Sequence, residues 1–384
     1  MAEGLEQAGL TVERIGPLKS QRNPINVLRY LWNSKVRRLN DHPQRDPGFL
    51  KNYARQVERA LQGSDAQLVL GAGGMPLAYL KTDLPVVLWT DCTFAGLENY
   101  YDKYSNLSAR TARNGHACDQ SLFNRIDMAI FPSRWAADSA INGYGFSDDK
   151  ITIISRGAGV ECDRSEEDII RLIDERPRDT CRLLWVGVDW ERKGGEIALE
   201  AARLLNERDI PTELRVVGVK PPESLDLPDW VNLFGYLDKR DPAQRRVLDG
   251  LFATSHFFML PTQAEAYGIV FCEASSFGLP SIATRTGGTG DAVKEGVSGW
   301  TIDPDRPASD YADAAERCFR DPQHYASVAR SAFHDFQTRT NWTVVCQQAA
   351  RAIKELIAQK SPAPTTGYQP PTSSPEDVSA EHAL

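Results

Sequence analysis

Two acidic residues, Glu265 and Glu273, mark the segment of this chain whose residue types and spacing are best suited to chemistry. The apolar run 256–260 before them is typical of a buried strand that ends at Pro261, and a helix is predicted to begin near Gly268. The first N–H groups of a helix lack intrahelical partners and carry partial positive charge, so a strand, loop and helix in this order can capture an anion. Two carboxylates beside it would repel a phosphate. We therefore expect them to accept hydrogen bonds from hydroxyl groups, such as those of a sugar and a ribose.

Two basic residues, Arg192 and Lys193, lie in a second loop of the same kind. This loop separates a predicted strand at 182–187 from a predicted helix at 196–205, whose apolar residues recur at helical spacing. Two cations beside a helix N-terminus would stabilise the negative charge that grows on a departing phosphate. On their own, such cations more often belong to a solvated loop. Their occurrence together with the pair of glutamates favours a functional site.

The segment from Glu265 to Glu273 resembles the signature of the retaining glycosyltransferases of family 4, in which seven residues separate two glutamates. Segments further along the chain resemble the family's helix end and buried strand, its glycine-rich turn and its G-x-x-G hairpin: 275–284, 287–291 and 296–299. The resemblance implies the GT-B fold, an α/β architecture of two Rossmann-like domains whose parallel sheets face a central cleft. It also implies a hexosyltransferase that uses a nucleotide diphosphate sugar as donor, with retention of configuration. We expect no cofactor, and no metal ion is required if the two cations balance the charge of the diphosphate.

The resemblance also implies roles for individual residues. Lys193 matches the lysine that grips the donor diphosphate. The family often has an arginine where this chain has Val188, and Arg192 would supply that charge from further along the loop. Glu265 would hold the donor sugar and Glu273 the ribose. The remaining donor contacts would come largely from backbone groups, at the helix start for the diphosphate and after the strand 231–235 for the nucleobase: Gly268, Ile269, Val270, Tyr236 and Leu237.

Three other candidate features, which involve acidic or histidine side chains, can also be explained without a role in ligand binding. Asp91 follows a predicted strand at the carboxyl end, where ligands bind in parallel sheets, and the resemblance implies that it faces the donor sugar from the other domain. A helix cap is the alternative for Asp91. His116 is better explained as a residue of a polar helix than as a ligand contact. Asp303 and Asp305 have the spacing of a metal-binding D-x-D motif but fall in an ordinary loop, and no His or Cys cluster predicts a metal site.

Short apolar runs alternate with helical patterns through both halves of the chain, which predicts two lobes of βα units with parallel sheets. Strands are expected at 67–71, 85–89, 128–131 and 151–154, and near Leu183, Leu214, Val231, Phe257 and Ser281. The expected organisation is an acceptor-side N-terminal domain at 1–160, a linker at 161–180, a nucleotide-sugar-binding domain at 181–345, a helix at 346–359 that returns to the first lobe, and a disordered tail at 360–384.

The first ten residues of the chain have the pattern of a helix. A GT-B domain begins with a strand and a glycine loop before that helix, so we expect both to be missing here and Met1 to be an internal methionine. This leaves open a second class of function, a nucleotide-sugar-binding protein without catalysis that is truncated or depends on a partner. A sugar phosphorylase or a sugar-nucleotide epimerase with the same fold is a further alternative.

The amino-acid composition limits which partners and which cellular compartment the protein can have. The chain of 384 residues has 44 basic and 52 acidic side chains, and its net charge of −8 argues against nucleic-acid binding. Its seven cysteines are odd in number and unclustered, which suits a reducing cytoplasm. No apolar run approaches the roughly 18 residues of a transmembrane helix. We expect a cytoplasmic enzyme of carbohydrate biosynthesis whose acceptor, whether a sugar, a lipid-linked molecule or a small molecule, is not identified by the sequence.

The segment 19–59 differs from the rest of the chain in its charge. It contains ten basic residues and three acidic ones, with aromatic residues among them. Such a segment is either a solvated helical face or a surface for an anionic lipid or acceptor. The second possibility would place the protein peripherally on the inner face of a membrane.

Overall fold

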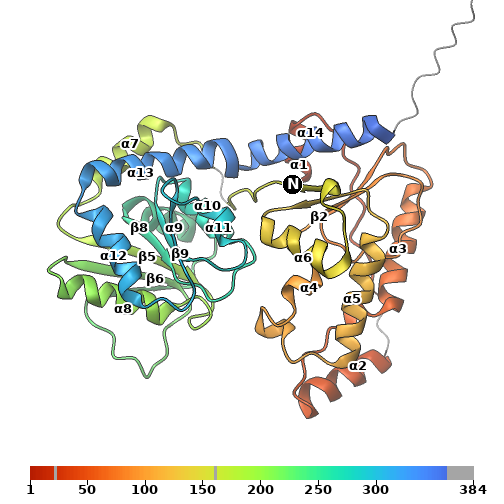
Figure 1. The fold of residues 1–384 in the computed structure, drawn as a ribbon, viewed down its shortest axis with the longest axis horizontal. Helices are drawn as coiled ribbons and strands as arrows, with labels where there is room; N and C mark the ends of the chain where they lie inside the picture. The colour runs from red at the N-terminus through yellow and green to blue at the C-terminus, as the bar shows by residue number, and fades with distance from the viewer. Residues whose placement is uncertain (21–23, 160–161, 361–384) are drawn as a thin grey trace, which may run out of the picture.

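The computed structural model describes residues 1–20, 24–159 and 162–360. It has two lobes, each built on a parallel sheet, and a long helical segment runs across both (Figure 1). This confirms the predicted α/β architecture with two parallel sheets. Three expectations concern residues outside the described ranges: Arg22 of the basic segment, the boundary between the first lobe and the linker at 160–161, and the tail from 361 onward.

The N-terminal lobe contains a four-stranded parallel sheet with strand order β1-β2-β3-β4. Its strands are Val69–Gly71 (β1), Val86–Trp89 (β2), Met128–Phe131 (β3) and Ile151–Ile153 (β4). All residues of β2 and β3 are buried, because helices cover both faces of this sheet. Side chains alternate between the faces, so that Val86 and Leu88 pack on one side and Val87 and Trp89 on the other.

The order of these strands determines where the helices lie. Parallel strands in sequential order, joined by right-handed connections, place their connecting segments on a single face. Three helices pack on that face: α3 (Pro47–Leu61), α5 (Ala109–Phe123) and α6 (Arg134–Tyr144). The opposite face would expose Val87 and Trp89 to water. Two helices from the ends of the described chain cover it: α1 (Ala2–Gln7), which confirms the helix predicted there, and α14 (Trp342–Lys360).

Short elements complete the first lobe on its outer end and along the cleft. They are α2 (Pro24–Leu31), the π-helical turn η1 (Trp32–Val36), the 3₁₀ turns η2 (Pro43–Arg45), η3 (Asp102–Tyr104) and η4 (Asp148–Lys150), and α4 (Phe94–Leu97). Figure 1 shows α2 at the end of this lobe that lies farthest from α14.

The C-terminal lobe contains a six-stranded parallel sheet with strand order β10-β9-β8-β5-β6-β7. Its strands are β5 (Cys181–Gly187), β6 (Thr212–Gly218), β7 (Val231–Gly235), β8 (Phe257–Leu260), β9 (Ser281–Thr284) and β10 (Gly299–Ile302). The chain builds outward from β5 in one direction and then from β8 in the other. This is the doubly wound arrangement, in which ligands bind at the point where the order reverses.

Helices cover both faces of the second sheet. They are α8 (Gly195–Glu207), α9 (Pro242–Thr254), α10 (Ile269–Ser275), α11 (Thr289–Ala292), α12 (Ala308–Phe319) and α13 (Pro322–Asp335). The expected linker at 161–180 contains a further helix, α7 (Glu166–Glu175). Ser165 and Asp168 form a capping box at its start, and Ile169 and Ile173 are buried in the core of the C-terminal lobe. Burial of this apolar face makes the helix part of the C-terminal lobe.

The lobes are joined by a continuous helical path. The chain passes from α13 through the π-helical turn η5 (Phe336–Thr340) into α14, which crosses to the first lobe (Figure 1). Helix α14 begins at Trp342, four residues before the expected 346, because the Asn341 side chain accepts the N–H of Val344 at 2.9 Å. Across residues 1–20, 24–159 and 162–360, we find no helix with the length and apolarity needed to span a membrane.

Candidate active site

The loops after β5 and β8 form the centre of the candidate site. These strands are neighbours in the sheet although they are far apart in the sequence, and the strand order reverses between them. The loops touch, because the N–H of Gln263 donates to the carbonyl of Arg192 at 2.8 Å. Gly194 has a left-handed backbone with φ 67°, and a Cβ there would overlap the carbonyl oxygen of Pro261. The structure thus brings together the two segments that the sequence indicated.

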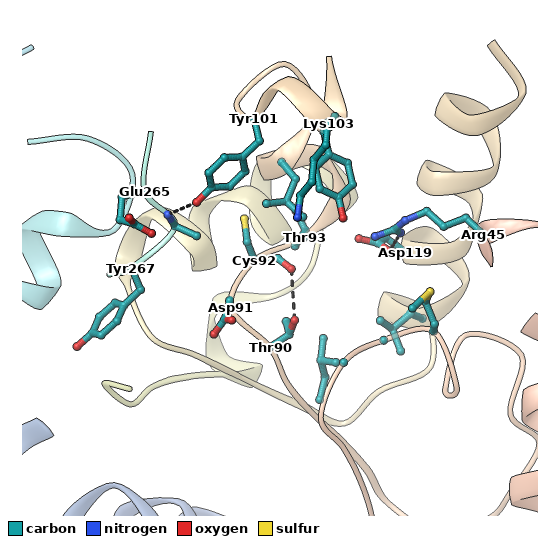
Figure 2. A pocket seen from close by; sticks show the side chains of 18 of the residues that line it. Arg45, Thr90, Asp91, Cys92, Thr93, Tyr101, Lys103, Asp119, Glu265 and Tyr267 are labelled. Atoms are coloured by element: carbon teal, nitrogen blue, oxygen red, sulfur yellow. Dashed lines mark hydrogen bonds and ion pairs between the residues drawn. The ribbon is translucent and has the colours of Figure 1, made fainter. Parts of the chain in front are cut away.

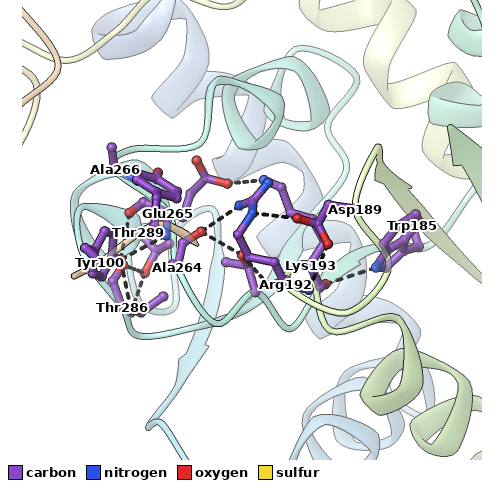
Figure 3. A network of polar contacts seen from close by, with 12 residues as sticks. Tyr100, Trp185, Asp189, Arg192, Lys193, Ala264, Glu265, Ala266, Thr286 and Thr289 are labelled. Carbon is purple, nitrogen blue, oxygen red and sulfur yellow. Dashed lines mark hydrogen bonds and ion pairs between the residues drawn. The ribbon is translucent and has the colours of Figure 1, made fainter. Parts of the chain in front are cut away.

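Lys193 and Glu265, one from each loop, form an ion pair at the edge of the cleft (Figure 3). Both side chains are 13% exposed, so the pair is largely withdrawn from water. The carbonyl of Lys193 accepts a hydrogen bond from Trp185 Nε1 at 3.1 Å, which holds the loop against a buried indole. Two residues predicted to act on the donor therefore lie in contact, and each neutralises the charge of the other.

Arg192 makes its contacts within the two loops. Its Nε lies 3.1 Å from Asp189 Oδ2, and its Nη1 donates to the carbonyl of Ala264 at 2.9 Å. The guanidinium group also lies 5.5 Å from the centre of the Tyr101 ring. These contacts use several of the donors of the guanidinium, and they tie the loop after β5 to the loop after β8.

Glu273 lies inside α10, which follows Gly268 in its left-handed conformation (φ 90°). Glu273 is 2% exposed, and Lys239 Nζ donates to its two carboxylate oxygens at 2.6 and 2.5 Å. Gly159 reaches the same carboxylate from the end of the first lobe, since a Cβ on it would lie 2.6 Å from Glu273 Oε1. Sequence reasoning missed Lys239. Its place just beyond the carboxyl end of the predicted strand at Val231 was the available signal.

The other residues predicted to bind the donor lie along the same edge. Tyr236 follows β7 with its side chain 67% exposed, whereas Leu237 packs against the core of the lobe. Gly268 and Ile269 line the cleft at the start of α10, and the side chain of Ile269 is 39% exposed. Val270 turns toward the core.

Two tyrosines of the first lobe hold the backbone beside Glu265. The Tyr100 hydroxyl accepts the N–H of Glu265 at 2.9 Å and lies 3.0 Å from Thr286 Oγ1 (Figure 3). The Tyr101 hydroxyl accepts the N–H of Ala266 at 2.6 Å (Figure 2). Burial raises the pKa of both phenols, so both are neutral and remain available as hydrogen-bond partners. We call these contacts the tyrosine clasp; sequence analysis did not identify either residue.

A cavity of about 500 Å³ lies between the lobes (Figure 2). Its wall in the C-terminal lobe includes Glu265, and its wall in the N-terminal lobe includes Asp91, which is half exposed and forms an ion pair with Arg156. The two acids therefore line one cavity from opposite lobes. His116 does not line it and instead lies 3.0 Å from Glu98.

The end of this cavity in the first lobe carries a second set of charges. Asp119 is buried, and burial raises its pKa although Arg45 and the N–H of Phe94 act in the opposite direction. Arg45 lies 3.3 Å from Asp119 and stacks over Phe94. Lys103 lies over the ring of Tyr104 at 5.3 Å and forms no ion pair with any described residue. This end of the cavity thus offers one uncompensated cation.

Asp303 and Asp305, which have the D-x-D spacing, lie just after β10. Asp303 forms an exposed ion pair with Arg285 at 3.2 Å, in the loop that follows β10. In the part of the chain that the structure describes, no three His, Cys, Asp or Glu side chains are grouped so as to hold a metal ion.

Comparison with known proteins places the chain in a family. A model described as Glycosyltransferase Family 4 matches residues 1–161, and one described as Glycosyl transferases group 1 matches residues 180–321. A D-inositol 3-phosphate glycosyltransferase of Corynebacterium glutamicum (strain R) is 26% identical over 291 residues, which are 72% of this chain and 68% of the relative. One of Thermobifida fusca (strain YX) is 28% identical over 254 residues, 63% of this chain and 58% of the relative.

Solved structures agree on the fold. Anabaena Alr3699/HepE in complex with UDP and glucose superposes with a TM-score of 0.58 at 18% identity, covering 79% of this chain and 81% of that one. WaaG, a glycosyltransferase involved in lipopolysaccharide biosynthesis, superposes with a TM-score of 0.60 at 19% identity, covering 92% and 93%. The family models span both lobes, and the doubly wound second sheet carries the paired glutamates at its switch point. The chain is therefore a retaining glycosyltransferase of family 4 with the GT-B fold.

Proposed function

We propose that the donor is a nucleoside diphosphate sugar bound in the cleft, where the loops after β5, β7 and β8 converge. The observation that carries this proposal is a pair of acid–cation contacts on that edge, Lys193 with Glu265 and Lys239 with Glu273. A donor of this class has hydroxyl groups for the two carboxylates and a diphosphate for an ammonium group. The C-terminal lobe would thus be the nucleotide-sugar domain and the N-terminal lobe the acceptor side.

Each predicted residue has a role in this proposal. Lys193 stabilises the diphosphate as its β-phosphate becomes the leaving group, and Arg192 fixes the loops that hold Lys193. Glu265 binds hydroxyls of the sugar, and Glu273 binds those of the ribose. The backbone at the start of α10 (Gly268, Ile269 and Val270) contacts the diphosphate, and the backbone at Tyr236 and Leu237 contacts the base. The neighbour solved with UDP and glucose supports uracil as the base.

The acceptor, in our proposal, occupies the end of the cavity in the first lobe. There Asp91 lies opposite Glu265, in a position to accept a hydroxyl of the donor sugar or of the acceptor. The relatives named above act on D-inositol 3-phosphate, which combines ring hydroxyls with a phosphate. Lys103 supports an anionic acceptor of this kind, because it lines the cavity without a carboxylate partner among the described residues.

The seven cysteines are all free, which supports a reducing compartment and hence the cytoplasm. We further propose that the basic segment 19–59 brings the protein to the inner face of a membrane as a peripheral protein.

A panel of nucleotide sugars tests the proposed function. The protein should bind one of them and transfer its sugar to an added polyol or polyol phosphate, giving a product that keeps the anomeric configuration of the donor by NMR. The rate should be unchanged by EDTA, since the proposed charge stabilisation uses Lys193 and no metal ion. Tight binding with neither transfer nor hydrolysis would instead support a non-catalytic binding protein, and phosphate-dependent cleavage or epimer formation would support a phosphorylase or an epimerase.

A further inference from the structure

The segment formed by α2 and η1 is an amphipathic helix whose polar side faces the protein. Asn26 and Asn33 are buried against the lobe, at 9% and 6% exposure. Between them, Arg29 lies 3.8 Å from Asp41 and 3.6 Å from Asp46, both of which are buried. A surface helix of a soluble protein normally packs its apolar side on the core and presents its polar side to water. This one is attached by hydrogen bonds and ion pairs.

The apolar side of the same segment faces solvent. Leu28, Trp32 and Val36, which are spaced one helical turn apart, are 68%, 58% and 60% exposed. Other large side chains beside them are also exposed: Val27, Tyr30 and Leu31. Single exposed apolar residues are ordinary, but a contiguous stripe of this size on one helix marks an interaction surface.

The charges around this stripe indicate what kind of surface it meets. Lys35, Arg37 and Arg38 are exposed and form no ion pair with described residues. No acidic residue occurs between positions 24 and 38, although the whole chain has a net charge of −8. An apolar helical stripe bordered by cations and aromatic side chains suits the interface of a bilayer, where apolar groups enter the acyl boundary and cations meet lipid phosphates.

We propose that α2 and η1 dock the protein on an anionic lipid bilayer, with the stripe from Leu28 to Val36 inserted at the interface. A second copy of the chain is a poorer occupant of this surface, because it would bring Lys35, Arg37 and Arg38 of both molecules together. The helix lies at the outer end of the first lobe, away from α14 (Figure 1). The described residues therefore leave the stripe from Leu28 to Val36 open to solvent.

The docking surface also adjoins the cleft. A surface hollow beside η1 is lined by Tyr30, Asn40, His42 and Lys103, and Lys103 also lines the cavity between the lobes. Docking through α2 would thus place the acceptor end of the cavity near the membrane surface. This connection rests on the proposed acceptor site, whereas the docking itself does not.

The docking proposal assigns the membrane association proposed above to one helix and one kind of lipid. Vesicle flotation tests it without any substrate, so its result is independent of the proposed donor and acceptor sites. The protein should float with vesicles of phosphatidylcholine and phosphatidylglycerol and much less with phosphatidylcholine alone. Trp32→Ser with Leu28→Ser should lower the bound fraction. Lys35→Glu with Arg37→Glu should lower the partition constant by more than about 25-fold, given about fivefold for each of the two cations removed and further repulsion from the two carboxylates added. Val247→Ser is the matched control, because Val247 is an exposed apolar residue of α9.

Several outcomes would overturn the proposal. One is no flotation of the unaltered protein with anionic vesicles, and another is equal flotation of the stripe variant and the control. A third is a dimer in light scattering that Trp32→Ser converts to a monomer, which would assign the stripe to a second copy. Circular dichroism of each variant should match that of the unaltered protein, because the replaced side chains are exposed. If the stripe variant is unfolded, the Lys35→Glu, Arg37→Glu variant decides the question, since it leaves every apolar contact in place.

Discussion

If Lys193 binds the donor diphosphate, as we propose, the Lys193–Glu265 ion pair rearranges on donor binding, because a diphosphate and a carboxylate compete for one ammonium group. We expect Lys193→Ala to lower kcat by about a hundred- to a thousandfold. This is the usual effect of losing one hydrogen-bond donor that is directed at charge developing in the transition state. Nucleotide affinity should change much less. The control is Lys220→Ala, which removes an exposed lysine shortly after β6 at the same edge of the sheet. Steady-state kinetics with a near-normal kcat for Lys193→Ala would show that Lys193 does not act on the leaving group.

Replacement of Glu273, unlike that of Lys193, is expected to affect nucleotide binding. Its carboxylate is 2% exposed and is held by Lys239, so it is oriented before any ligand arrives. Glu273→Gln keeps the shape of the side chain and removes the charge, and a hydrogen bond to a charged group contributes about 1.5–3 kcal/mol. We expect the affinity for the nucleoside diphosphate to fall by roughly 10- to 150-fold in calorimetry, with Glu223→Gln, an exposed loop residue, as control. Unchanged affinity would remove the proposed ribose contact.

At the scale of elements, the tyrosine clasp connects the segment between α4 and η3 to the loop after β8. Tyr100→Phe with Tyr101→Phe removes two hydroxyls that accept the backbone N–H groups of Glu265 and Ala266. Each hydrogen bond contributes about 0.5–1.5 kcal/mol net. We expect each of these two amides to exchange with deuterium about 2- to 13-fold faster in the ligand-free double variant.

Tyr104→Phe is the matched control for the clasp, because its hydroxyl bonds no described residue. Exchange that is equally slow in the double variant and in Tyr104→Phe would mean that the loop after β8 is held by its own lobe. The experiment therefore separates contacts between the lobes from contacts within the C-terminal lobe.

At the scale of the whole molecule, a buried histidine in the C-terminal lobe makes the stability of the fold depend on pH. His256 is 2% exposed, and its Nδ1 accepts the N–H of Arg182 at 3.0 Å. Burial, followed by the charge of Arg176, lowers the pKa of His256 to about 3. In the unfolded chain this group would titrate near its ordinary value of about 6.5. The unfolded state therefore binds the extra proton between these two values, and stability falls as the pH is lowered through that window.

The expected slope from this one residue is up to about 1.4 kcal/mol of unfolding free energy per pH unit below pH 6. Urea denaturation at pH 7 and at pH 5 measures it. His256→Asn, which offers a neutral acceptor in place of Nδ1, should be less stable than the unaltered protein at pH 7 but should lose less stability on acidification. An unchanged dependence on pH in His256→Asn would assign the acid sensitivity to other groups.

The sequence by itself determined most of the local architecture of this protein. The apolar runs at 85–89 and 128–131 predicted β2 and β3, because residues buried on both faces must be apolar throughout. The spacing of Glu265 and Glu273, with a glycine before the helix, located the loop after β8 and α10. These features depend on residues that are close in the chain, so they can be recognised in the sequence without any knowledge of tertiary contacts.

Tertiary structure decided which residues those local elements meet. Lys239 was found only when the end of β7 came beside α10, and the tyrosine clasp only when the two lobes were in contact. The charged stretch around α7 belongs to the C-terminal lobe because Ile169 and Ile173 find an apolar surface there. The inverted orientation of α2 follows from Asp41 and Asp46, whose burial beside Arg29 fixes its polar side inward. Amphipathic spacing predicts that a helix has two sides, but only the groups packed against it decide which side faces water.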